Sequence, residues 1–135
     1  MLKLIIGKKG TGKTKQLIDA VNTAVKTDKG HLVFINNGDR HMFDLDYKVR
    51  LIDTQDFKIL RYGTLYGMLC GIMAQDFDIS NIFVDSVTKI VEEDFVNSQE
   101  ALEEIAKVAE KYNVNITMTA SIDAQTAPEF VKKYL

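Results

Sequence analysis

The chain has 135 residues, of which 46% are hydrophobic and 27% are charged, a composition typical of a globular protein with one buried core. We therefore predict a single domain over residues 1–135. The net charge of −2 gives no general attraction for nucleic acid, because non-specific binding needs a basic surface. The only cysteine, Cys70, excludes an intrachain disulfide and a cysteine-based zinc cluster. The two histidines, His31 and His41, have no metal-ligand spacing and are interpreted as structural.

Two apolar segments are too short to be targeting or membrane segments. The N-terminal run over residues 2–6 leads directly into a glycine-rich stretch, unlike the apolar region of a signal peptide. Residues 62–73 are well short of the ~20 residues that a membrane-spanning helix needs. We expect a cytoplasmic protein with no membrane partner.

The first elements of the chain predict a strand, a loop, a helix and a second strand. Residues 2–6 form an apolar strand that ends at Gly7, and apolar residues then recur at helical spacing from Leu17 to Val25. Residues 31–36 are a continuous apolar run, which is typical of a strand buried on both faces of a parallel sheet. Together these elements predict a right-handed crossover unit.

The loop between the first strand and the first helix fits the phosphate-binding pattern G-x-x-x-x-G-K-[S/T]. Backbone N–H groups of residues 9–14 are expected to surround the β-phosphate of a nucleotide, aided by the positive end of the following helix. Lys13 is expected to reach the β- and γ-phosphates as a catalytic residue, and Thr14 to bind Mg²⁺ through its hydroxyl. The predicted nucleotide-binding residues are Gly7, Lys8, Lys9, Gly10, Thr11, Gly12, Lys13, Thr14 and Lys15.

The middle of the chain predicts a half-exposed strand over residues 47–54 and a helix within residues 56–77. In that helix Gly63, Gly67 and Gly71 recur at every fourth position on one face. One interpretation is that a neighbouring element packs very close to these glycines, each of which costs about 1 kcal/mol relative to alanine in a helix interior. The other interpretation is a helix–helix contact between the subunits of a homo-oligomer.

Residues 81–86 predict another buried strand, with Asp85 at its carboxyl end. Ligands of parallel sheets gather at that edge, and a carboxylate there can hold Mg²⁺ through the water shell of the ion. We therefore assign Asp85 a catalytic, metal-binding role. The alternative is that its side chain caps the next helix.

The C-terminal third predicts a helix that begins at Asn97 or Ser98 and includes Tyr112 in its buried stripe. A strand over residues 114–121 and a short helix from Pro128 complete the chain. Strands that alternate with helices indicate an α/β protein with a parallel sheet.

The glycine-rich loop and the strand that ends in Asp85 together resemble the P-loop NTPase superfamily. One strand and helix intervene before Asp85 and a polar-ended strand follows it, an order similar to the RecA-like branch. In that branch the end of the following strand senses the γ-phosphate, and Thr119 and Ser121 match this position here. The resemblance implies a three-layer fold with a mostly parallel, RecA-like central sheet, and it implies ATP and Mg²⁺ as ligands.

Within that branch, the order of parts is similar to the nucleotide domain of thymidine kinase, including the turn at residues 38–40 after the second strand. Two departures put nucleoside kinase activity in doubt. That family carries a catalytic glutamate directly after the metal-binding aspartate, where this chain has Ser86. Its zinc-bound substrate lid also needs several cysteines, and this chain has one.

No residue replaces the missing glutamate by any spacing rule. Glu92, Glu93 and Asp39 could substitute as the base from nearby loops, although such a residue is more often a solvated surface charge. Arg40 is the candidate for neutralising a phosphate, in cis or across a subunit interface, and a surface ion pair is the alternative.

The sequence leaves three functions open. The first is a Mg-ATP-binding P-loop protein with weak or partner-dependent hydrolysis, acting as a small ATPase or nucleotide switch. The second is a nucleoside or nucleotide kinase resembling thymidine kinase. The third is a non-hydrolysing module that assembles through the glycine-striped helix in a nucleotide-dependent way. ATP is the expected nucleoside triphosphate because the guanine-specific N-K-x-D pattern is absent from the chain.

Overall fold

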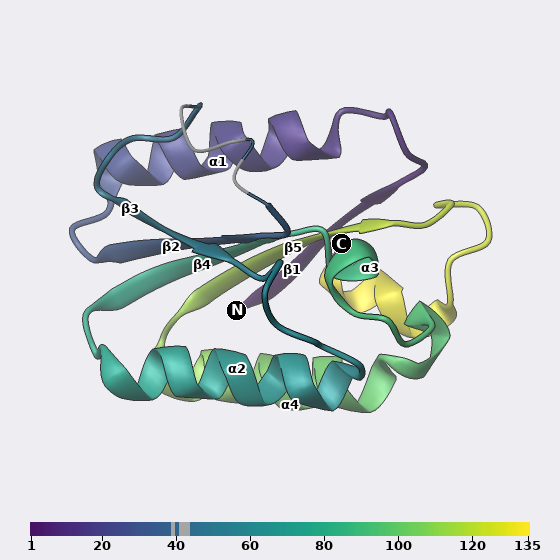
Figure 1. The fold of residues 1–135 in the computed structure, drawn as a ribbon. Coiled ribbons are helices and arrows are strands. Elements are labelled where there is room, and N and C mark those ends of the chain that lie inside the picture. Colours follow the sequence, from purple (N-terminus) through teal and green to yellow (C-terminus); the bar gives the residue numbers. More distant parts are fainter. Residues whose placement is uncertain (39, 41–43) are drawn as a thin grey trace.

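The computed structural model describes residues 1–38, 40 and 44–135 and contains a central β-sheet with helices on both faces (Figure 1). None of the described helices is long and apolar enough to cross a membrane. The elements in chain order are β1 (Leu2–Gly7), α1 (Lys13–Thr27), β2 (His31–Asn36), β3 (Val49–Asp53), α2 (Tyr62–Gln75), β4 (Ile79–Asp85), α3 (Val87–Ile90), the 3-10 helix η2 (Phe95–Asn97), α4 (Gln99–Tyr112), β5 (Asn115–Ser121) and the 3-10 helix η3 (Glu129–Tyr134).

The five strands form one sheet in the order β1-β5-β4-β2-β3, and every strand pair in it is parallel. The predicted α/β architecture with a parallel sheet is therefore confirmed. The edge strand β3 is only partly buried, as its alternating sequence predicted. The last strand in sequence, β5, lies between β1 and β4 rather than at an edge of the sheet.

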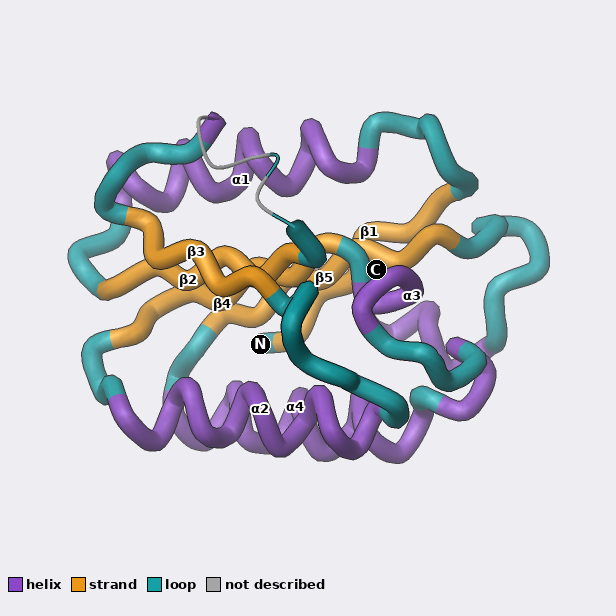
Figure 2. Tube along the Cα trace, in the orientation of Figure 1, coloured by secondary structure: helices purple, strands orange, loops and turns teal. Residues whose placement is uncertain are grey.

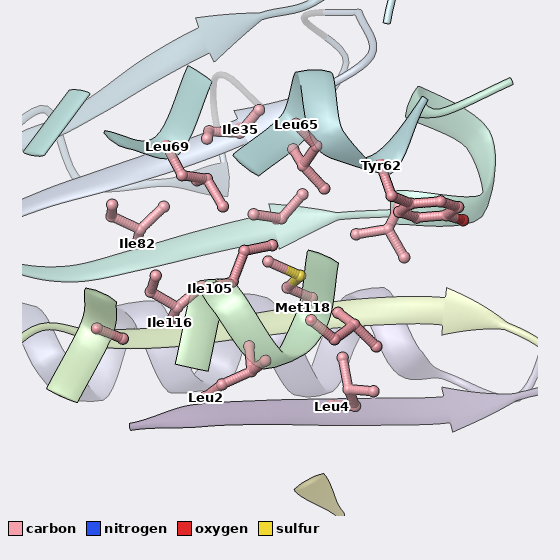
Figure 3. Close-up of a cluster of buried hydrophobic side chains, with 14 of the residues drawn as sticks. Leu2, Leu4, Ile35, Tyr62, Leu65, Leu69, Ile82, Ile105, Ile116 and Met118 are labelled. Carbon is pink, nitrogen blue, oxygen red and sulfur yellow. The ribbon is translucent and has the colours of Figure 1, made fainter. Parts of the chain in front are cut away.

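Helices cover the sheet in two layers, with α1 on one face and α2 and α4 on the other (Figures 1 and 2). Side chains alternate along each strand, so Phe34 and Phe83 pack with α1 while their neighbours Ile35 and Val84 enter the opposite cluster. Figure 3 shows that larger cluster, in which α2 and α4 meet the sheet. Its labelled members are Leu2, Leu4, Ile35, Tyr62, Leu65, Leu69, Ile82, Ile105, Ile116 and Met118.

The glycine stripe lies on α2, which runs from Tyr62 to Gln75 and so falls within the predicted range of residues 56–77. Cβ atoms added at Gly63, Gly67 and Gly71 would meet no atom within 4 Å. The interpretation that another element of this chain packs close to these glycines is therefore wrong for the described residues. A contact between subunits stays a prediction.

The helix predicted near residue 98 is α4, and its ends differ from expectation in two ways. Ser98 is the N-cap residue, but its hydroxyl makes no cap hydrogen bond and is buried without a partner among the described residues. Tyr112 is 50% exposed rather than buried. Asn113 ends the helix in the left-handed conformation, with φ of 54°. The sequence did not predict α3, which follows β4 directly.

Candidate functional site

A pocket of about 640 Å³ lies where the carboxyl ends of three strands meet the start of α1 and the short helix α3. This is the edge at which parallel α/β sheets gather their ligands. The pocket is lined by residues of the glycine-rich loop, the strand ends and α3: Lys9, Gly10, Gly12, Lys13, Thr14, Asn36, Arg40, Asp85, Ser86, Thr88, Lys89 and Ser121.

The glycine-rich loop is closed by two hydrogen bonds to one carbonyl oxygen. The backbone oxygen of Lys8 accepts from Thr11 Oγ1 at 2.7 Å and from Lys13 Nζ at 2.9 Å. Gly10 and Gly12 have φ of 84° and 85°, in the left-handed region that side chains with a Cβ rarely adopt. Lys13 is only 7% exposed, so its ammonium group is held inside the loop and not on the open surface.

The N-terminus of α1 is not capped by a side chain. Its N-cap residue, Gly12, makes no side-chain hydrogen bond, and the first turn contains no acidic residue. The first N–H groups of a helix have no partner within the helix and carry a partial positive charge. Because Lys13 and Thr14 both line the pocket, this positive helix end faces into it.

Asp85 connects the loop to the sheet. Its Oδ2 accepts a hydrogen bond from Thr14 Oγ1 at 3.0 Å, and its Oδ1 accepts one from Thr119 Oγ1 at 2.6 Å. The side chain is 4% exposed, and no described lysine or arginine forms an ion pair with it. The interpretation of Asp85 as a helix cap finds no support, since α3 has no side-chain cap.

Because side chains alternate between the two faces of the sheet, three polar side chains lie in one row on the face that α1 covers. Asn36 and Asp85 are direct neighbours in the register of β2 and β4, and both share the sheet face of Phe34 and Phe83. Thr119 follows Met118 on β5 and reaches Asp85 from the other side. The ends of β2, β4 and β5 therefore each contribute one buried polar residue to this row.

Ser86 lies directly after Asp85, joined to it by a cis peptide bond, and is part of a hydroxyl chain. The hydroxyl oxygens of Ser86 and Thr88 are 2.8 Å apart, and Thr88 Oγ1 accepts from the backbone N–H of Ser121 at 2.9 Å. Either hydroxyl can be the donor in the hydrogen bond between Ser86 and Thr88. A hydroxyl can orient a ligand in this way, but at neutral pH it does not act as a general base.

The pocket brings together most of the predicted site residues. Those that line it are Lys9, Gly10, Gly12, Lys13, Thr14, Arg40, Asp85 and Ser121. Lys8 and Lys15 have exposed side chains outside it, and Lys8 Nζ pairs with Asp123 at 3.5 Å. Gly7 lies beneath the loop, where an added Cβ would come within 2.6 Å of Thr11 Oγ1. Gly7 and Thr11 therefore shape the loop without lining the pocket.

The acidic candidates for a base do not reach the pocket within the described part of the chain. Glu93 Oε1 instead accepts from the backbone N–H of Tyr62 at 2.9 Å and so caps the start of α2. Neither Glu92 nor Glu93 lines the pocket. Asp39 and His41 lie outside the described residues. Among the described lining residues, Asp85 is the only carboxylate.

Three lining residues were missed by the sequence reasoning: Asn36, Thr88 and Lys89. Asn36 had the same signal as Asp85, a polar side chain at the carboxyl end of a continuous apolar strand. Thr88 and Lys89 had no local signal, because they enter the pocket only through the unpredicted helix α3.

His31 lies at the opposite, amino-terminal end of β2. Its Nδ1 is 2.8 Å from Asp76 Oδ2, and the hydrogen bond and charge of Asp76 raise the pKa of His31. The hydrogen bonds from His31 and from the backbone N–H of Asp78 lower the pKa of Asp76. The ligand atoms of these three side chains lie within 4.8 Å of one another, a proximity that the sequence spacing did not reveal.

No family model and no curated protein matches this sequence. The motifs, the strand order and the geometry of the pocket are therefore the observations that bear on function.

Proposed function

We propose that this chain is a Mg-ATP-binding protein of the P-loop NTPase type, with weak or partner-dependent ATP hydrolysis, that acts as a small ATPase or nucleotide switch. The observation that carries the proposal is the 3.0 Å hydrogen bond from Thr14 to Asp85, which joins two motifs 71 positions apart in the sequence. Each motif alone has an ordinary structural explanation. Their meeting in one pocket favours a nucleotide site.

Phosphate binding is supported by the loop and the helix that follows it. The uncapped start of α1 offers backbone N–H groups and a partial positive charge to an anion. Lys13 Nζ occupies the inside of the loop, where it donates to the carbonyl of Lys8. A phosphate group of the bound nucleotide takes the place of that carbonyl as the partner of Lys13, because a charged acceptor is the stronger one.

Magnesium binding is supported by the donor set at the base of the pocket. The Thr14 hydroxyl and the Asp85 carboxylate are oxygen ligands, which Mg²⁺ prefers, and they already lie side by side. Asp85 is a buried carboxylate with no described cationic partner, an arrangement that a bound cation stabilises. When bound, the ion neutralises charge on the β- and γ-phosphates. Thr14 and Asp85 are the residues that would hold it.

The strand order supports the RecA-like branch. One strand, β5, separates β1, which leads into the glycine-rich loop, from β4, which ends in Asp85. Thr119 on β5 donates to Asp85 at 2.6 Å. The end of this intervening strand is the position that the resemblance associates with sensing the γ-phosphate.

Weak or partner-dependent hydrolysis is supported by the missing base. Asp85 is the only carboxylate among the described lining residues, and its two oxygens are engaged by Thr14 and Thr119. Ser86 occupies the position of the glutamate that the resemblance leads one to expect. Arg40 supplies positive charge to the pocket, but it does not accept a proton from water.

The test is nucleotide binding by calorimetry, followed by ADP formation, with wild type and Lys13→Ala. We expect Lys13→Ala to weaken ATP binding about 10- to 100-fold, because a charge-assisted hydrogen bond is worth about 1.5–3 kcal/mol. Lys26→Ala is the matched control, since Lys26 is an exposed lysine in the last turn of the same helix. Circular dichroism checks the fold of each variant, because Lys13 is buried.

Each alternative function has its own outcome in the same assay. Equal ATP affinity of wild type and Lys13→Ala overturns the phosphate role of the loop. ADP formation that requires added nucleosides identifies a kinase. Tight binding with no turnover, together with assembly that depends on ATP, identifies the non-hydrolysing module.

A further inference from the structure

Asn36 is a buried polar residue with an unused hydrogen-bond donor in the wall of the pocket. It is the last residue of β2, it is 2% exposed and it lines the pocket. Its Nδ2 is buried and has no hydrogen-bond partner within the described part of the chain. An unsatisfied buried polar group costs about 1–3 kcal/mol, so such a group needs an explanation.

The orientation of this amide is fixed by its surroundings. Asn36 Oδ1 accepts from the backbone N–H of Asn37 at 2.9 Å, which assigns the oxygen to that end. The backbone oxygen of Asn36 accepts from Thr54 N at 2.9 Å and from Thr54 Oγ1 at 3.3 Å. The backbone oxygen is thus held by Thr54, the residue directly after β3, and the side-chain oxygen is held by Asn37. Of the side-chain polar atoms of Asn36, the buried Nδ2 is therefore the one that has no partner among the described residues.

The position of Asn36 in the sheet indicates which part of a bound nucleotide would lie next to it. It is the register neighbour of Asp85 on the same sheet face, and neighbouring strands are about 4.8 Å apart. In the strand order it lies on the far side of Asp85 from β1, where the glycine-rich loop begins. A phosphate chain that extends from the loop past Thr14 and Asp85 therefore presents its last phosphate to Asn36.

The hydrogen-bonding chemistry of the unpartnered Asn36 NH₂ group limits what it can bind. An amide NH₂ has two donors and no acceptor, so it binds an anionic oxygen but cannot take a proton from water. We propose that Asn36 is a specificity-determining residue whose Nδ2 donates to a γ-phosphate oxygen, so that the site prefers a nucleoside triphosphate to a diphosphate. This inference rests on the proposed function and extends it to a residue that neither motif contains.

The test compares the affinities for ADP and for the non-hydrolysable β,γ-imido analogue of ATP, both with Mg²⁺. The variants are Asn36→Leu, which keeps the size and removes both the Nδ2 donor and the Oδ1 acceptor of the Asn37 N–H, and Asn36→Asp, which keeps an acceptor oxygen and replaces the donor with a carboxylate oxygen. We expect Asn36→Leu to weaken binding of the analogue about tenfold, as loss of one hydrogen bond to a charged group predicts, with ADP affinity unchanged. Asn36→Asp should weaken the analogue further, because its charge adjoins Asp85 and the phosphate.

Asn81→Leu is the matched control. Asn81 is also a buried strand asparagine, at 7% exposure, but its Nδ2 donates to Asp28 and, at 3.0 Å, to Ser80 Oγ, away from the pocket. This variant should lose stability and keep the wild-type preference for the triphosphate. In wild type, the side-chain amide resonances of Asn36 should shift with the ATP analogue and not with ADP, which tests the contact even if a variant fails to fold.

The result that overturns the proposal is an equal change for both nucleotides in Asn36→Leu, or amide resonances that respond equally to both. Failure of the proposed function looks different, because Lys13→Ala would then leave both affinities unchanged. Weaker binding of both nucleotides by Lys13→Ala, with an unchanged preference in Asn36→Leu, rejects only the role of Asn36.

Discussion

The hydroxyl of Thr14 donates to the carboxylate of Asp85 at 3.0 Å, across 71 positions of sequence. Thr119 engages the other carboxylate oxygen at 2.6 Å, and the Asp85 side chain is almost fully buried. Two neutral hydroxyls leave the negative charge of Asp85 in place. A buried charge without an ionic partner is unfavourable, which makes this carboxylate the point at which cation binding and nucleotide binding are expected to be coupled.

Asp85→Asn tests this coupling. The amide keeps the size and an acceptor oxygen for Thr14 but removes the charge. We expect the enhancement of ATP binding by Mg²⁺ to fall about tenfold, which corresponds to 1.4 kcal/mol, while binding without Mg²⁺ changes little. The measurement is calorimetric titration of ATP with Mg²⁺ and with EDTA. Asp19→Asn, an exposed carboxylate on α1, is the control, and an equal loss in both conditions would contradict a role in holding the metal.

Ser86→Glu tests whether the missing base limits hydrolysis. Ser86 lines the pocket next to Asp85, so a glutamate at this position would lie in the wall of the proposed nucleotide site. A positioned general base raises the rate of a reaction about 10²- to 10⁴-fold, and we expect the rate of ADP formation to rise by at least tenfold. Ser86→Gln has the same size without the basic carboxylate and serves as the control. If both variants match wild type, water positioning or an arginine from a partner limits the rate instead.

The His31–Asp76 pair predicts a dependence of stability on pH. Asp76 raises the pKa of His31, with a smaller contribution from Asp78. His31 and the backbone of Asp78 lower the pKa of Asp76, and Arg50 adds to this effect. Because the pKa of His31 is higher in the folded state, its protonation stabilises the fold at pH values below the unfolded pKa of about 6.5. This stabilisation is lost as the pH rises through the folded pKa. Because the pKa of Asp76 is lower in the folded state, its ionisation stabilises the fold at pH values above the unfolded pKa of about 3.9. This stabilisation is lost as the pH falls through the folded pKa.

Both contributions are therefore present between about pH 4 and pH 6.5, and the histidine part disappears at higher pH. We expect His31→Gln to reduce the free energy of unfolding at pH near 6 and to leave it nearly unchanged at pH near 8. Urea unfolding across this range measures the difference. Asp76→Asn should remove the same pH-dependent part, and a uniform loss at every pH would show that His31 acts only through packing.

Gly67→Ala tests the exposed glycine stripe of α2. The added Cβ meets no atom within 4 Å, so alanine should raise the free energy of unfolding by up to about 1 kcal/mol through its higher helix propensity. Denaturant unfolding measures this value, and sedimentation measures the oligomeric state. A loss of stability that depends on protein concentration would instead identify the stripe as a subunit contact, since close backbone approach there needs glycine.

The sequence by itself determined the elements that depend on local patterns. Apolar runs at strand period and helical period predicted the alternating α/β architecture, because burial on a sheet or a helix face follows the spacing of side chains along the chain. It also determined the loop shape, since Gly10 and Gly12 adopt conformations that favour glycine. Asp85 was placed at a strand end for the same local reason.

The tertiary structure decided what depends on contacts between distant segments. The placement of β5 between β1 and β4 brought Thr119 to Asp85, and the position of α3 brought Thr88 to Ser121. The pairing of β2 with β4 made Asn36 a neighbour of Asp85. Local periodicity specifies which face of a strand is buried but not which strand lies beside it, because strand order is set by packing over the whole sheet. That order, and with it the composition of the pocket, is what the sequence could not provide.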